Sequence, residues 1–308
     1  MVNDQRKSMI KKYEFTKELH PNFPELKRIR ALIDIPYHNV KVGEEGGWLE
    51  GEHNLSHDGS CWVADEAIVF SHARVVDGAI VCESAVVSCD AVIRCSARIK
   101  GRARVRHNAK VGGHAIVSED AAVQGTAKVF GSAKVEGSSI INDSANVHGR
   151  AVVLGITRIY DSASVCDAAQ VMGCHIMGNS WVGGDAKVIG PVCLRDEALV
   201  AGNAFLHGRV VVSGHVHIRG DAAIGGRTQI HGTGTDKGSF PLSIGGDVSL
   251  PVAGIESIRG CGVELLTNAD VIIFDKTYGN SVRTINSVNI KDQDKILSEL
   301  LLAELSKS

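Results

Sequence analysis

The chain has 308 residues, a formal net charge of −2 at pH 7, 44% hydrophobic but only 5% aromatic residues, 34 glycines and 6 prolines. A charge so close to zero excludes the overall phosphate attraction on which nucleic-acid binders rely. No stretch approaches the roughly 18 apolar residues that a membrane helix needs, and the eight cysteines contain no CxxC pair. These features predict a cytoplasmic protein with reduced thiols and a core of small aliphatic side chains.

Residues 1–60 carry no repeat. Short apolar runs at 13–16, 27–35 and 40–51 favour strands in this segment. We expect it to form a β-rich N-terminal cap, because the repeats that follow would otherwise expose unpaired strand edges at their first turn.

An aliphatic residue recurs every six positions from Val63 to Ile230. The series runs in steps of six from Val63 to Met177, takes one step of five to Val182, and resumes in steps of six, which makes 29 units. Neither a helix nor a single flat strand has a period of six. A chain that turns a corner every six residues explains the period, so residues 61–231 are predicted to be an all-β solenoid.

Two flanking positions repeat with the aliphatic one. Alanine stands two residues before it without a gap from Ala67 to Ala133, and a turn former such as Gly101 or Asp161 stands two residues after it. The aliphatic side chain is predicted to fill the interior, with alanine beside it in the crowded corner. Glycine would supply the backbone dihedral that the turn requires.

The step of five predicts a local irregularity near Asn179 and Trp181. In this register Met177 points inward and His175 takes the small slot that alanine occupies elsewhere. We therefore expect His175 to be a buried structural histidine.

Residues 232–308 are predicted to hold a loop, a partial coil and a small α/β C-terminal cap. The repeat stops after Ile230, is expected to return at Ile244 and Leu250, and gives way to an amphipathic helix near residues 292–305.

The repeat resembles that of the hexapeptide-repeat family. The resemblance implies a left-handed parallel β-helix with three strands per 18-residue coil, here about ten coils. Residues 46–69 are also similar to the opening of bacterial and phage-borne members grouped with acetyltransferases. Family members commonly form homotrimers, and an outward apolar face would suit such an interface. That face is predicted to carry Trp62, Ile80, Ile116, Val152, Leu154, Met172, Ile189 and Phe205.

The segment after the repeat resembles the glycine-rich loop of hexapeptide serine acetyltransferases. It consists of Gly232, Thr233, Gly234, Thr235, Asp236, Lys237 and Gly238, followed by Ile244 and Gly245. The resemblance implies a coenzyme A site, with acetyl-CoA or another acyl-CoA as cosubstrate. Backbone N–H groups and Lys237 suit phosphate. Pro241 lies one position early, and the His-Pro pair expected before the isoleucine is absent.

Acyl transfer to a hydroxyl or amine needs a general base, which hexapeptide acyltransferases supply as a histidine. Within about four coils, roughly 20 Å, of the loop, the histidines are His175, His207, His215, His217 and His231. His215 lies at a corner one coil before the loop and is the first candidate for the catalytic base. His207, on the predicted intersubunit face, is the second candidate.

Two other histidine patterns are set aside. His107 matches a frequent family placement but lies seven coils from the loop. His72, His107 and His114 resemble the zinc ligands of hexapeptide carbonic anhydrases, yet their spacing misses the two-coil register, so no metal is predicted.

Two main functions remain open, beside a third interpretation as a binding or regulatory module with a ligand in the loop at residues 230–250. One is a CoA-dependent acyltransferase acting on a small acceptor. The other is a non-catalytic β-solenoid, such as a scaffold or a phage-derived structural protein. Its support is that twenty six-residue units pass without an inserted loop, and the fold alone does not choose among these functions.

Overall fold

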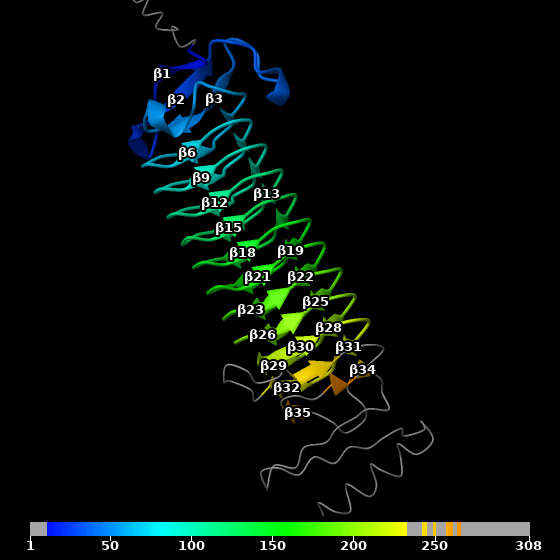
Figure 1. Cartoon of the computed structure of the whole chain (residues 1–308). Helices are drawn as coiled ribbons and strands as arrows, with labels where there is room; N and C mark the ends of the chain where they lie inside the picture. The colour runs from blue at the N-terminus through cyan, green and yellow to red at the C-terminus, as the bar shows by residue number, and fades with distance from the viewer. Residues whose placement is uncertain (1–10, 233–241, 245–248, 251–256, 261–263, 266–308) are drawn as a thin grey trace, which may run out of the picture. The chain divides into compact units, whose positions relative to one another are not determined.

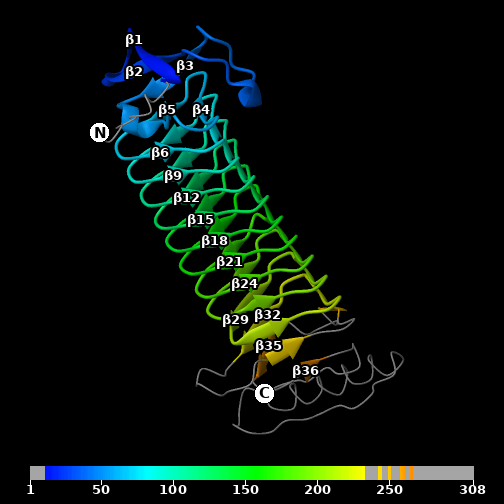
Figure 2. The same cartoon turned by 45° about the horizontal axis from the view of Figure 1, so that its top comes forward.

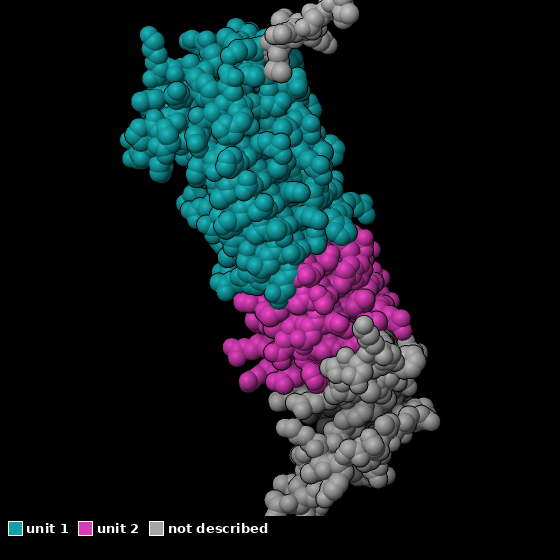
Figure 3. Space-filling view, turned by 60° about the vertical axis from the view of Figure 1, so that its left-hand side comes forward, with its two compact units in different colours: residues 1–161 teal, residues 162–308 magenta. Residues whose placement is uncertain are grey.

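The computed structural model describes residues 11–232 and four later segments, 242–244, 249–250, 257–260 and 264–265. Two compact units make up the chain, residues 1–161 (unit 1) and residues 162–308 (unit 2), coloured separately in Figure 3. Both are parallel β-solenoids, and together they hold about ten turns. No helix in the described segments is long and apolar enough to cross a membrane.

Unit 1 begins with an antiparallel segment. Strand β1 (Tyr13–His20) pairs with β2 (Phe23–Ala31), which pairs with β3 (Glu45–Leu49). Short 3-10 helices follow β2 and β3, at Pro36–His38 and Glu52–Asn54. Strand β3 also pairs in parallel with β5 (Ile68–Val69) of the solenoid. The predicted β-rich segment therefore occupies the edge of one solenoid sheet.

The turns of unit 1 contain 17 short strands, β4 to β20, stacked one turn upon the next (Figure 1). One sheet continues from β5 with β8 (Val86–Val87), β11 (Arg104–Val105), β14 (Ala122–Val123), β17 (Ile140–Ile141) and β20 (Arg158–Ile159). A second has β4 (Trp62–Val63), β7 (Ile80–Val81), β10 (Arg98–Ile99), β13 (Ile116–Val117), β16 (Lys134–Val135) and β19 (Val152–Leu154). The third has β6 (Arg74–Val75), β9 (Val92–Ile93), β12 (Lys110–Val111), β15 (Lys128–Val129) and β18 (Asn146–Val147). Paired residues lie 18 apart, as in Arg98 and Ile116.

Unit 2 repeats this arrangement (Figure 2). One sheet has β23 (His175–Ile176), β26 (Cys193–Leu194), β29 (Val211–Gly214), β32 (Gln229–Gly232) and β35 (Ser257–Gly260). A second has β22 (Gln170–Met172), β25 (Lys187–Ile189), β28 (Phe205–His207), β31 (Ala223–Ile224) and β34 (Ser249–Leu250). The third has β21 (Ser164–Val165), β24 (Trp181–Val182), β27 (Leu199–Val200), β30 (Val216–Ile218), β33 (Leu242–Ile244) and β36 (Glu264–Leu265).

The interior of both units is the predicted aliphatic stack. The repeat residues from Val63 to Val171 and from Val182 to Ile230 are at most 1% exposed. The twelve alanines from Ala67 to Ala133 are fully buried beside them. Where a hydroxyl replaces alanine, as at Ser139 and Thr157, it donates to the backbone carbonyl three residues earlier. The core assignment from the period of six is confirmed for these residues.

The backbone conformation at the corners of the solenoid explains why turn-forming residues recur there. From Asp65 to Gly226, the residue two positions after each inward aliphatic has a positive φ, whether it is Gly131 (φ 71°) or Asp143 (φ 55°). Carboxylates at several corners accept a hydrogen bond from a backbone N–H one turn later, such as Asp143 from Asp161 at 3.2 Å. Glycine lowers the steric cost of a left-handed residue, and Asp adds a hydrogen bond between successive turns.

The predicted register of the five-residue step is wrong by one residue. Ile176 points inward and is fully buried, whereas Met177 is partly exposed. Cys174 fills the small slot, so His175 is a half-buried outward residue and not a buried structural histidine. The shortened step lies between Val171 and Ile176. The corner at Gly178 (φ 70°) is regular, and no irregularity is centred on Asn179 and Trp181.

The outward face of the β4 sheet is less apolar than predicted. Trp62 is fully buried, and the register inserts Arg98 between Ile80 and Ile116. Lys134 then separates Ile116 from Val152. An 18-residue period brings every third unit onto one face, and the polar members of that series interrupt the apolar ones.

The partial coil after Ile230 is present. Strand β33 pairs with β30 and aligns Ile244 with Ile218, and β34 aligns Leu250 with Ile224. The predicted terminal helix near 292–305 lies outside the described residues.

Candidate functional site

Two histidines meet in the later described turns of unit 2. His215 occupies the bend between β29 and β30, and His217 lies in β30. Val216 and Ile218 are buried on either side of His217. Strand alternation therefore turns both imidazoles outward. Their ring centroids are 5.2 Å apart, with an edge-to-face angle of 80°.

Burial and charge act together on His217. Its partial burial lowers the pKa of the imidazole, and the neighbouring His215 and Arg219 lower it further. A protonated ring here would lose hydration and face positive charge. His217 is therefore neutral at pH 7, which is the form that can accept a proton.

Gly232 brings the start of the glycine-rich segment against His215. Strand β32 pairs with β29 so that Gly232 lies beside Gly214. A Cβ added to Gly232 would collide with the His215 backbone. Thr233, Gly234, Thr235, Asp236, Lys237 and Gly238 lie outside the described residues, so the predicted phosphate contacts remain predictions.

His231 pairs with a hydroxyl on the β29 sheet. Its Nδ1 lies 2.9 Å from the Ser213 Oγ, across strands in register. His231 is exposed and Ser213 is buried. The sequence pattern did not single out Ser213. The signal was the 18-residue separation, which stacks the two residues on adjacent turns.

His207 belongs to a different sheet from the His215–His217 pair. It ends β28, where its ring stacks on Phe205 with centroids 4.8 Å apart. The imidazole also covers Gly225, at which a Cβ would collide with it. The structure thus brings His215 together with His217, a residue that ranked below His207 in the sequence interpretation.

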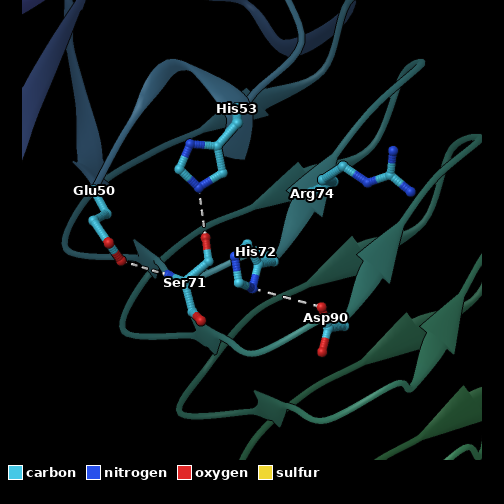
Figure 4. Close-up of a pocket in the computed structure, with 6 residues that line it drawn as sticks. All are labelled: Glu50, His53, Ser71, His72, Arg74 and Asp90. Atoms are coloured by element: carbon cyan, nitrogen blue, oxygen red, sulfur yellow. Dashed lines mark hydrogen bonds and ion pairs between the residues drawn. The ribbon is translucent and has the colours of Figure 1, made fainter.

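Unit 1 has a shallow hollow that the sequence did not reveal (Figure 4). It is lined by Glu50, His53, Ser71, His72, Arg74 and Asp90. His53 Nε2 lies 2.7 Å from the Ser71 carbonyl oxygen, and the Ser71 N–H donates to Glu50 at 2.6 Å. His72 lies 3.7 Å from the Asp90 carboxylate. Most of these groups bond to one another, and the turn at Glu52–Asn54 that carries His53 has no repeat signature.

The other predicted histidines have local roles. His107 is itself a left-handed corner (φ 59°), and its Nδ1 accepts a hydrogen bond from the Gly125 N–H at 3.4 Å. In the described part of the chain, no three His, Cys, Asp or Glu side chains are grouped so that they could hold a metal ion.

No protein-family model matches the sequence, and no curated protein is significantly similar to it. The likeness to hexapeptide-repeat proteins therefore depends on the repeat and the loop motif.

Proposed function

We propose that the protein is a CoA-dependent acyltransferase, with the His215–His217 pair as general base and residues 232–238 as the CoA-binding loop. The observation that carries the proposal is the imidazole pair at 5.2 Å beside Gly232, where that loop begins. The acceptor would be a hydroxyl or amine of a small molecule, which attacks the thioester carbonyl after losing its proton to the base.

The electrostatics of the pair support this role. A general base must be unprotonated when the acceptor binds, and the lowered pKa of His217 keeps one ring of the pair neutral at pH 7. His215 lies nearer the start of the loop, because its backbone contacts Gly232.

Replacing either ring should reduce turnover without preventing CoA binding. We expect His215→Ala and His217→Ala each to lower kcat by about 10² to 10⁴-fold, as loss of a general base does. Lys237→Ala should instead weaken CoA binding about tenfold to a hundredfold. Acetyl-CoA consumption with a panel of small amines and alcohols measures kcat, and titration calorimetry measures the affinity for CoA.

His207→Ala is the matched control, because His207 lies in another sheet of the same unit. This variant should leave both kcat and the affinity for CoA unchanged. Loss of turnover in this variant alone would transfer the role of base to His207, the second sequence candidate.

The acid limb of the pH profile of kcat/KM should lie below the ordinary pKa of histidine. Because burial, and then His215 and Arg219, lower the pKa of His217, this ring stays neutral to a lower pH than an ordinary histidine, whose pKa is about 6.5. We expect kcat/KM to hold between pH 7 and that value and to fall only below it. A limb at or above pH 7 would contradict the assignment.

We further propose that the solenoid units are left-handed, that residues 1–60 and 232–308 cap the prism of residues 61–231, and that three chains associate in parallel in the cytoplasm. The period of six and the similarity to hexapeptide proteins support these proposals. Light scattering should give about three times the 32.7 kDa chain mass. A mass near 33 kDa would exclude the homotrimer.

A non-catalytic scaffold is the second candidate, and one observation favours it. From β4 to β20 the strands follow one another at six-residue spacing with no inserted loop. Such a regular unit has little to shape an acceptor pocket. If millimolar CoA gives neither heat nor a thermal shift, the acyltransferase proposal fails and the scaffold is favoured.

A further inference from the structure

A lysine and a cysteine are buried in contact with each other in unit 1. Lys12, just before β1, and Cys61, just before β4, both have 0% of their surface exposed. The Lys12 Nζ lies 3.1 Å from the Cys61 Sγ. The two residues are 49 positions apart, so the contact joins the antiparallel N-terminal segment to the first turn of the solenoid.

The surroundings of Lys12 are unusual for a lysine. Its Nζ donates to three acceptors, the Cys61 sulfur and the carbonyl oxygens of Asp58 and Gly59, both at 3.5 Å. Among the ion pairs within residues 11–232, none involves Lys12. Lysine is almost never fully buried without a partner, and an isolated buried ammonium is costly. The sulfur is the one acceptor of the three that can carry a negative charge.

The backbone holds both side chains in place. The Lys12 N–H donates to His57 Nδ1 at 3.1 Å, and its carbonyl accepts from the Leu32 N–H at 2.9 Å. The Cys61 N–H donates to the Asp77 carbonyl at 2.8 Å. The His57 ring stacks on Tyr13 at 4.4 Å between centroids. The amine and the sulfur therefore cannot easily separate.

A Lys–Cys pair can be electrically neutral in two ways, as amine and thiol or as ammonium and thiolate. Burial raises the pKa of the Cys61 thiol, and the Lys12 charge opposes this rise. Both forms avoid a net buried charge. The raised pKa makes amine and thiol the prevailing form, and proton transfer from the thiol to the amine supplies the thiolate that reacts with peroxide.

We propose that Lys12 and Cys61 are a modification site, at which hydrogen peroxide joins the Nζ and the Sγ in a covalent sulfenamide crosslink.

The reaction is balanced in two steps. The thiolate attacks peroxide, so an S–O bond forms, the O–O bond breaks, and the departing hydroxide takes a proton from the Lys12 ammonium to leave as water. Sulfur loses two electrons, which peroxide gains, and Cys61 becomes a sulfenic acid. The neutral amine then attacks sulfur, so an S–N bond forms, the S–O bond breaks, and the oxygen leaves as a second water with an amine proton.

The crosslink would fasten the N-terminal segment to the solenoid edge. It closes a 49-residue separation in the chain, and closing a loop of this length restricts the unfolded chain. The bond would be reversible, because a thiol can attack the sulfur of a sulfenamide and release the amine. Peroxide is small enough to reach the pair through local openings of the N-terminal segment.

Peptide mass spectrometry of the full-length chain after hydrogen peroxide treatment tests the proposal. We expect a peptide containing Lys12 linked to one containing Cys61, lighter by two hydrogen atoms than their sum. Lys12 should then resist trypsin, dithiothreitol should release the pair, and the crosslinked protein should melt about 5 °C higher than the released one.

Adjacent residues provide matched controls. Lys11→Met should still crosslink, because Lys11 is exposed and pairs with Glu52. Lys12→Met should abolish the link while keeping the buried alkyl stem, and Cys61→Ser should also abolish it. The exposed Cys95 is a matched thiol, and Cys95→Ser should leave the link intact.

Two results in the unaltered protein would overturn the proposal, and neither depends on a variant that folds. One is Cys61 recovered as unlinked sulfinic or sulfonic acid. The other is Cys61 unchanged and unlinked after Cys95 has been fully oxidised.

Discussion

Val123→Asp should destabilise unit 1 by about 3 to 5 kcal/mol, the usual cost of an uncompensated buried charge. Val123 is fully buried in β14, and its register partners Val105 and Ile141 are fully buried as well. The new carboxylate would face these aliphatic side chains from both neighbouring turns. Because each turn contacts only the next, the loss should spread to β11 and β17.

Ala122→Asp is the control for this variant. Ala122 precedes Val123 in the same strand but points outward, and its register partner Arg104 is exposed. The same charge there should change stability by less than about 1 kcal/mol. Thermal unfolding and hydrogen exchange over residues 104–141 give the comparison. Equal losses in the two variants would mean that the inward assignment is wrong.

Gly131→Ala should cost about 2 to 4 kcal/mol, from backbone strain and a steric clash together. Gly131 has φ 71°, and its Cβ would lie 2.6 Å from the Gly149 carbonyl oxygen on the next turn. Gly113, Gly131 and Gly149 stack in one column of corners with positive φ. A methyl group in this column would push two turns apart.

Gly173→Ala separates the cost of backbone strain from the cost of the steric clash. Gly173 has nearly the same dihedral, φ 69°, but a Cβ there meets no atom closer than 3.9 Å. It should lose only the strain of a left-handed alanine, about 1 kcal/mol. Denaturant midpoints of the two variants check the difference. If Gly173→Ala were the more damaging, contact between turns would not explain the glycine column.

The step of five shows where a one-dimensional pattern misleads. Both Ile176 and Met177 are apolar, so a count from the N-terminal side chose Met177, although the structure places Ile176 inward. Hydrophobicity alone therefore does not show which of the two side chains points inward. The pairing of Ile176 with Leu194 and the corner at Gly178 decide the register, because strands must align with the turn that follows.

The candidate histidines also differ in how far the sequence could predict them. The sequence indicated His215 because it lies one turn before the glycine-rich segment. It ranked His217 low, since an outward polar residue carries no signal of its own. The ring contact at 5.2 Å depends on both rings pointing outward, two residues apart, and the pKa of His217 is lowered first by partial burial and then by His215 and Arg219.

The period of six alone predicts the inward aliphatic stack, the alanine slot and the positive-φ corners, because each depends on a side chain repeated at a constant interval. Contacts between residues outside that interval are visible only in the folded chain. Cys61 occupies the alanine slot before Val63, but Lys12 belongs to no repeat, and the two come together through the pairing of β1, β2 and β3 at the solenoid edge. A period constrains contacts between equivalent positions, whereas a contact between an irregular segment and the repeat depends on three-dimensional packing, which leaves no periodic trace in the sequence.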